Sequence, residues 1–161
     1  MRNKTLSGAL AGVIAGLVFG VMMQLMRAPT PEGAEVPMMA MVAQVVRSSS
    51  LVVGWIYHLF NSAVIGAIFG WLLGDRMADH VGRAAAWGAG YGVVWWVLGG
   101  LILMPLALGM PIFAPLRMPP MRPVALGSLL GHVLYGLVLG TAFGWLHGAA
   151  RHPQVGAERH A

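Results

Sequence analysis

The sequence contains no cysteine and very few charged residues, and these two shortages exclude several classes of protein. Without cysteine the chain forms no disulfide and holds no cysteine-ligated iron–sulfur cluster, covalently attached haem or catalytic thiol. Charged residues make up 9% of the chain, against roughly 25% in average soluble domains. A chain of 161 residues needs a largely polar surface to stay in water, because small domains have much surface for their volume. The composition therefore indicates an integral membrane protein.

Carboxylates are especially scarce, and all five Asp and Glu residues fall outside the long apolar stretches. A proton relay or carboxylate-coupled transport inside the membrane has no obvious groups to use. The sequence also shows no phosphate-binding loop, zinc-protease motif or Ser-His-Asp arrangement. We therefore expect no enzymatic activity, and a small transporter is a weaker alternative.

Four apolar stretches are long enough to cross a bilayer, which takes about 20 helical residues. They run over residues 6–26, 51–73, 84–106 and 124–146. The pieces between them are too short for separate domains, so a single transmembrane domain over residues 1–161 is predicted, with a polar tail at 149–161. The expected fold is an all-α bundle of four transmembrane helices.

The second and fourth stretches share a pattern that indicates an internal repeat. His58 is followed by LFNSAVIGAIFGWL and His132 by VLYGLVLGTAFGWL, at an offset of 74 positions. Carried backward without gaps, this offset also pairs Gly8 with Gly82. Two copies of a unit with two helices are therefore predicted, over about residues 6–74 and 80–148.

The repeat also predicts the topology. Because each unit contains two helices, the second copy enters the membrane from the same side as the first, and the copies are parallel. Both termini then lie on one side, together with six of the ten Lys and Arg residues. This excess favours the cytoplasmic side of the inner membrane. The net charge of +5 is therefore assigned to orientation and to contact with anionic lipid, and not to nucleic acid.

Small residues at steps of four predict close contacts between helices, because such steps line one helix face and let two backbones approach. The first stretch carries Gly8, Gly12, Gly16 and Gly20. The second carries Gly54, His58, Ser62, Gly66 and Gly70, and the fourth carries Ser128, His132, Gly136, Gly140 and Gly144. These stripes predict a tight bundle. They also exceed what one small bundle needs, so some could contact a membrane-protein partner or a second copy.

His58 and His132 are the sharpest candidates for a site, because an ionisable residue inside a membrane span is by default a functional candidate. In the favoured interpretation each neutral imidazole makes a hydrogen bond across the bundle, for example to a backbone carbonyl. In the alternative both are axial ligands of a b-type haem, or they bind a transition metal. Arg47 and Arg122 would then pair with the haem propionates at the outer interface. Haem needs helices held well apart, whereas the small-residue stripes bring helices together.

Methionines in the outer connections make a copper site the second candidate. The residues are Met38, Met39, Met41, Met118 and Met121. Cu(I) prefers soft sulfur ligands, and the Met-Pro-Pro-Met run at 118–121 places two thioethers three residues apart. The favoured interpretation is that methionine fills irregular apolar gaps. We therefore expect no cofactor, with haem b and copper as the alternatives.

The two long outer connections are predicted to differ in local structure. Residues 36–47 form an apolar run with a proline suited to a first helical turn, which favours a short helix at the membrane surface. Residues 110–121 contain too many prolines to stay helical. Both connections are expected to cover the outer mouth of the bundle.

The whole chain resembles small four-span bacterial and archaeal membrane proteins of unassigned function. The likeness rests on the run GALAGVIAGLVFG at 8–20, on the Met- and Pro-rich outer connections, and on the second and fourth spans that end in FGWL. It implies the four-helix architecture and brings no activity with it. The leading hypothesis is a non-enzymatic accessory subunit or scaffold in a larger membrane assembly. The alternative is a small electron-transfer or metal-handling protein that uses His58 and His132.

Overall fold

The computed structural model describes residues 3–30, 33–77 and 80–148, and the predicted polar tail lies outside them. Four helical stretches among these residues are long and apolar enough to cross a membrane, as predicted. The first is α1 (Lys4–Leu25) and the second is α3 (Leu51–Met77). The third is α4 (Val81–Trp95), which continues through the π-helical segment η1 (Trp96–Leu103) and the short helix α5 (Met104–Ala107). The fourth is α7 (Arg122–Gly148).

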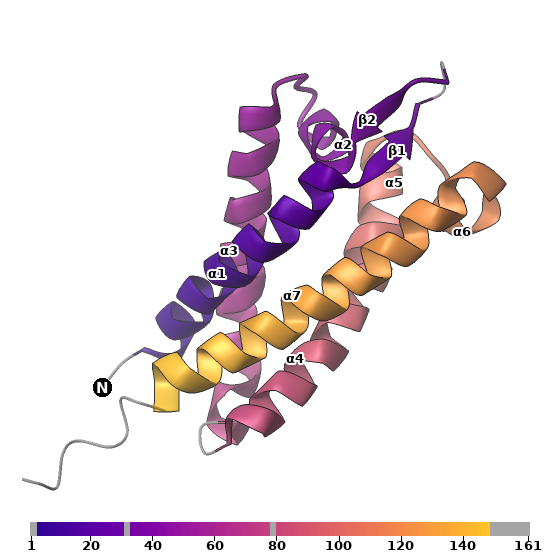
Figure 1. Ribbon diagram of the computed structural model, residues 1–161. Helices are drawn as coiled ribbons and strands as arrows, with labels where there is room; N and C mark the ends of the chain where they lie inside the picture. Colours follow the sequence, from indigo (N-terminus) through magenta and orange to yellow (C-terminus); the bar gives the residue numbers. More distant parts are fainter. Residues whose placement is uncertain (1–2, 31–32, 78–79, 149–161) are drawn as a thin grey trace, which may run out of the picture.

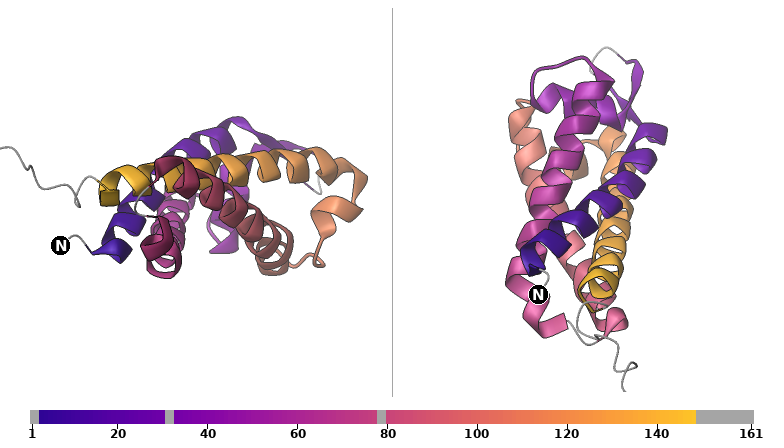
Figure 2. Two further views of the ribbon diagram at one scale, coloured as in Figure 1. Left: turned by 90° about the horizontal axis from the view of Figure 1, so that it is seen from below. Right: turned by 90° about the vertical axis from the view of Figure 1, so that its left-hand side faces the viewer.

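The four long helices lie in two layers. Helix α1 packs against both α3 and α7, and α4 packs against α7. Seen from below in Figure 2, α1 and α7 form one layer, while α3 and the α4–η1 rod lie beneath it and diverge. The starts of α1 and α4 and the ends of α3 and α7 lie at the same end of the bundle (Figure 1). The described ends of the chain are therefore on one side.

The opposite end of the bundle carries the two long connections (Figure 1). The first contains strands β1 (Arg27–Pro29) and β2 (Glu35–Pro37), which pair antiparallel, and then helix α2 (Met38–Val45). The short helix predicted in 36–47 is thus present, although Pro37 immediately precedes it and is not in its first turn. The second connection contains only the single turns α6 (Ala114–Arg117) and η2 (Pro119–Met121). Its prolines interrupt any longer helix, as predicted.

Helices α1 and α3 are in direct backbone contact at the predicted glycine stripes. A Cβ atom on Gly8 would overlap the carbonyl oxygen of Gly66, and one on Gly70 would overlap that of Lys4. A Cβ on Gly12 would likewise overlap the Ser62 carbonyl oxygen. Because no side chain fits between the backbones here, glycine is what permits this approach.

A second interface of the same kind joins α4 to α7. Gly88 lies against Gly136 and Gly140, as Gly12 lies against Ser62 and Gly66 in the first interface. Two further predicted glycines have other neighbours. A Cβ on Gly144 would come close to Val81 at the start of α4, and one on Gly54 would come close to the Met39 carbonyl in α2.

Residues that make equivalent contacts in the two interfaces are separated by one number of positions between α3 and α7 and by another between α1 and α4. Gly140 follows Gly66 by 74 positions, whereas Gly88 follows Gly12 by 76. Ala84, and not Gly82, therefore occupies the place that Gly8 has in the first interface. The ungapped pairing of Gly8 with Gly82 does not describe these contacts, because Gly82 is exposed and has open space around it.

Aromatic side chains close the centre of the bundle and join its two halves. Phe69 and Phe143 are fully buried, and their rings meet edge to face with centroids 5.6 Å apart. The Tyr135 hydroxyl donates a hydrogen bond to the Ser62 carbonyl, and the Tyr91 hydroxyl donates to the Ile65 carbonyl, each at 2.8 Å. Both hydroxyls thus bond to the backbone of α3 from helices of the other half.

Candidate functional site

A cavity of about 530 Å³ lies between α3 and η1, and residues of α1 and α7 also line it. Helices α2 and α5 line its end near the two long connections. Its lining is mainly apolar, with Val64 and Leu103 exposed at its edge. The polar residues that line it include His58, Asn61, Ser128 and His132. Cavities of this size and character accommodate organic molecules rather than single ions.

The segment η1 forms the wall of the pocket that faces α3. In η1 the helix is wider than an α-helix, as shown by the Met104 N–H, which bonds to the carbonyl of Gly99 five residues earlier. Trp96 begins this segment, and its indole N–H donates to the Ala125 carbonyl of α7 at 3.2 Å. Gly99 and Gly100 follow and line the cavity without side chains, and a Cβ on Gly99 would still have open space around it. The Trp96 indole lies between η1 and α7, and the two glycines that follow add no side chain, so space remains beside α7.

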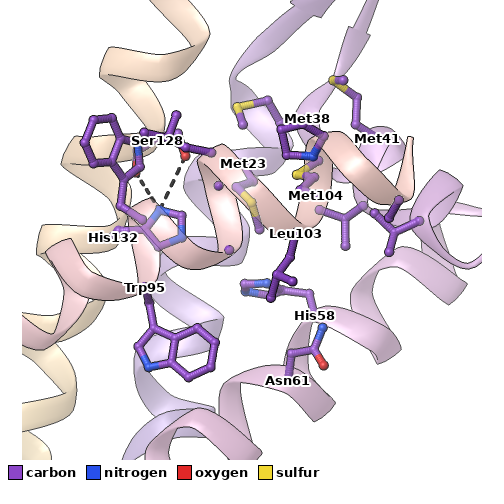
Figure 3. A pocket seen from close by; sticks show the side chains of 18 of the residues that line it. Met23, Met38, Met41, His58, Asn61, Trp95, Leu103, Met104, Ser128 and His132 are labelled. Atoms are coloured by element: carbon purple, nitrogen blue, oxygen red, sulfur yellow. Dashed lines mark hydrogen bonds between the residues drawn. The ribbon is translucent and has the colours of Figure 1, made fainter. Parts of the chain in front are cut away.

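His58 reaches the pocket from α3, where it is largely buried (Figure 3). Its Nε2 lies 2.9 Å from the Gly16 carbonyl oxygen of α1. Phe19 packs against the imidazole edge to face, with centroids 5.7 Å apart. The hydroxyl of Ser62 donates to the His58 carbonyl one turn earlier on the same helix, at 2.8 Å.

His132 reaches the same pocket from α7, on the side opposite His58 (Figure 3). Its Nδ1 lies 2.7 Å from the Ser128 carbonyl oxygen one turn earlier, so its bond stays within its own helix. Phe19 also packs against this ring, with centroids 4.9 Å apart. The structure thus brings the two predicted histidines to one cavity and places the ring of Phe19 against both.

The predicted methionines are divided by the fold. Met38, Met41 and Met121 line the pocket, whereas Met39 is fully buried outside its lining and Met118 is exposed. Two methionines of the spans, Met23 and Met104, line the pocket as well (Figure 3). Sequence reasoning missed this pair because it searched for sulfur in the connections, and only the fold shows that α1 and α5 end beside α2.

The two predicted arginines do not line the pocket. Arg47 is exposed and adopts a left-handed backbone conformation, with φ of 57°, just after the end of α2. Arg122 is exposed at the start of α7 and donates to the Leu116 carbonyl at 3.2 Å. In this arrangement neither guanidinium approaches the histidines from within the cavity.

The arrangement does not favour a haem between the two histidines. The Nε2 of His58 already bonds to the Gly16 carbonyl, and the Phe19 ring occupies the space next to both imidazoles. Axial ligation of one iron by both rings would require that bond to break and that ring to move. Among the residues that the structure describes, no three His, Asp or Glu side chains gather as a metal site.

Asn61, Trp95 and the Gly99–Gly100 pair also line the pocket. Asn61 is a polar residue and Trp95 an aromatic residue within a predicted span, but no pattern in the sequence places them, or Gly99, beside a cavity. A comparison with protein-family models, curated proteins and solved structures finds no match to this chain. The pocket itself is therefore the basis for assigning a function.

Proposed function

We propose that this chain is a non-enzymatic protein of the bacterial inner membrane that binds a lipid-soluble organic molecule between α3 and η1. The cavity of about 530 Å³ is the observation that carries this proposal. Its apolar lining suits a molecule that partitions into hydrocarbon, and its few polar groups suit a small polar head. The exposed Val64 and Leu103 at its edge give the molecule a path from the surrounding lipid.

The proposed topology places both termini in the cytoplasm. The starts of α1 and α4 and the ends of α3 and α7 lie at one end of the bundle, and six of the ten basic residues belong to that side of the predicted topology. Loops rich in Lys and Arg remain on the cytoplasmic side during insertion. The mouth of the pocket then lies in the outer half of the membrane, near the two long connections.

Filling the cavity tests the proposed function. Gly99→Phe places a ring in the open space at η1, whereas Leu98→Phe places the same ring at an exposed position of η1 outside the pocket lining and is the matched control. Each protein is reconstituted in nanodiscs and its retained small molecules are extracted and counted by mass spectrometry. We expect Gly99→Phe to retain about tenfold less than wild type, equivalent to about 1.4 kcal/mol of binding free energy. Equal retention by all three proteins would remove the proposal.

A second candidate function is that of an accessory or scaffold subunit, or a homo-oligomer, which packs through the outer face of α4. Gly82, Ala86 and Gly90 lie at steps of four on this face, and all three are exposed. Most other glycine stripes are already used inside the bundle, whereas a Cβ on Gly82 or Gly90 would have open space around it. Small residues at this spacing are typical of helix association in lipid.

Because the chain lacks cysteine, a single introduced thiol reports on that face. We expect Ala86→Cys to form a disulfide-linked dimer, or a link to a partner subunit, in membranes treated with an oxidant. Leu130→Cys on the exposed face of α7 is the control. Cross-linking of neither variant, or of both equally, would argue against a specific contact through α4.

A further inference from the structure

Each histidine of the pocket has one ring nitrogen bonded to a backbone carbonyl, and this fixes where its proton is. A carbonyl oxygen only accepts hydrogen bonds, so the Nε2 of His58 must donate to Gly16 at 2.9 Å. By the same argument the Nδ1 of His132 donates to Ser128 at 2.7 Å. A neutral imidazole has a single N–H. The Nδ1 of His58 and the Nε2 of His132 are therefore both lone-pair acceptors.

The pocket supplies neither nitrogen with a donor. Among the described residues, the hydrogen bonds of the two imidazoles involve only the nitrogens that face the carbonyls. Within the part of the chain that the structure describes, no carboxylate lines the cavity. A second proton on either ring would therefore place an uncompensated charge inside a membrane span, which is costly. The polar end of the pocket thus offers two acceptors to whatever enters it.

The surroundings of these acceptors favour an aromatic ring. Phe19 contacts both imidazoles, and Trp95 lines the cavity beside them (Figure 3). The thioethers of Met23 and Met104 line the same region. Aromatic rings pack well against other rings edge to face, and sulfur makes favourable contacts with ring edges. Apart from Tyr57 and Asn61, the lining towards Val64 and Leu103 is mainly apolar, which suits an alkyl or isoprenoid tail.

This inference rests on the proposed function and names its ligand class. We propose that the pocket selects lipid-soluble phenols or hydroquinones, whose hydroxyl groups donate hydrogen bonds to the Nδ1 of His58 and the Nε2 of His132. A molecule of the same shape that bears only acceptors, such as an aryl ether, could form no hydrogen bond to either imidazole nitrogen, because both sides would present lone pairs. The protein therefore discriminates by the hydroxyl hydrogen and not by the ring.

A matched pair of ligands tests the selectivity on the intact protein. The probes are para-octylphenol and its methyl ether, para-octylanisole, which differ only in the hydroxyl donor. Binding of each is measured by equilibrium retention on protein reconstituted in nanodiscs, with empty nanodiscs as the partition reference. We expect wild type to bind the phenol about tenfold more tightly than the ether, as one buried hydrogen bond would give.

A histidine variant then locates the acceptor. His132→Phe keeps a ring of similar size and removes only a bond within α7, so the bundle contacts stay intact. We expect its preference for the phenol to fall about twofold, because the single hydroxyl hydrogen then has one acceptor in place of two. His80→Phe, at an exposed position outside the pocket, is the control and keeps the full preference.

The outcomes separate the two proposals. Equal binding of phenol and ether by wild type, abolished by Gly99→Phe, would overturn the selectivity for donors and leave the ligand pocket in place. A preference that persists unchanged in His132→Phe and in a His58→Phe variant that melts normally would overturn the role of the histidines. Binding of neither probe above empty nanodiscs, together with no retained molecule in wild type, would remove the proposed function as well.

Discussion

The first helix of each half meets its partner in the same way at one end and differently at the other. Helix α1 stays close to α3 as far as Gly20, where a Cβ would overlap the Trp55 ring and come close to His58. Helix α4 stays close to α7 only as far as Gly92. Beyond it the chain enters η1, and Gly99 has open space around it. The pocket lies where the two halves stop being alike.

One residue accounts for much of this difference. Gly16 and Gly92 are in corresponding places when the two interfaces are matched by their contacts, so Gly20 corresponds to Trp96. Glycine lets α1 continue along its neighbour, whereas the indole of Trp96 fills that space and bonds to the Ala125 carbonyl. The lesson is that a close-packed pair of helices can open into a cavity where one small residue of its stripe is replaced by a large one.

The largest expected effect on stability comes from breaking the backbone contact between α1 and α3. Gly66→Ala in α3 would place a Cβ against the Gly8 carbonyl oxygen and the Gly12 backbone. Because neither backbone can give way without separating the helices, we expect a loss of roughly 1–3 kcal/mol in unfolding free energy. The measurement is denaturant unfolding in bicelles. Gly90→Ala, with open space around it, is the control, and it should lose no stability because alanine favours a helix more than glycine does. A similar loss in both variants would show that the close contact at Gly66 does not set the cost.

A smaller effect is expected from loosening the contact between the halves. Tyr135→Phe removes the buried hydrogen bond to the Ser62 carbonyl, and Tyr91→Phe removes the one to Ile65. We expect each to lower the unfolding free energy by about 1 kcal/mol. Tyr57→Phe, which has no described hydrogen bond to lose, should leave it unchanged. If Tyr135→Phe unfolds like wild type, the two halves are held by packing alone.

The smallest effect on stability is expected from an ion pair that joins only α1 and α3. Lys4 at the start of α1 pairs with Asp75 near the end of α3, and both side chains are at least partly exposed. Lys4→Ala is expected to cost a few tenths of a kcal/mol at low salt, with the difference vanishing as salt is added. Unfolding midpoints at two ionic strengths measure it. A salt-independent loss would indicate that the lysine stem contributes by packing.

Much of the architecture could be predicted because a membrane leaves few choices. A backbone in hydrocarbon must satisfy its own hydrogen bonds, so four apolar stretches become four helices. The glycine steps predicted which helix faces would touch, and Gly8, Gly66 and Gly136 all lie at such contacts. The short helix α2 followed from an apolar run next to a proline. Strands β1 and β2 were not predicted, because three residues each are too few for an alternating pattern.

The site was only partly predictable. His58 and His132 could be chosen from the sequence, since polar residues within spans stand out. Their partners could not, because a backbone carbonyl such as that of Gly16 has no sequence signal. The cavity could not be predicted either, since hydropathy is the same for an α-helix and for η1. It depends on where Trp96 and Gly99 come to lie against another helix.

The π-helical bonding of η1 has a consequence for how a ligand would bind. The Trp96 N–H is shared between the Gly92 and Val93 carbonyls, and the Met104 N–H reaches back to Gly99. These two N–H groups therefore keep backbone partners in the stretch where the chain departs from α7, as a backbone in hydrocarbon requires. The vacant volume is thus built into the resting fold. A ligand would therefore not have to separate the helices before it binds, and this preorganisation would favour its affinity.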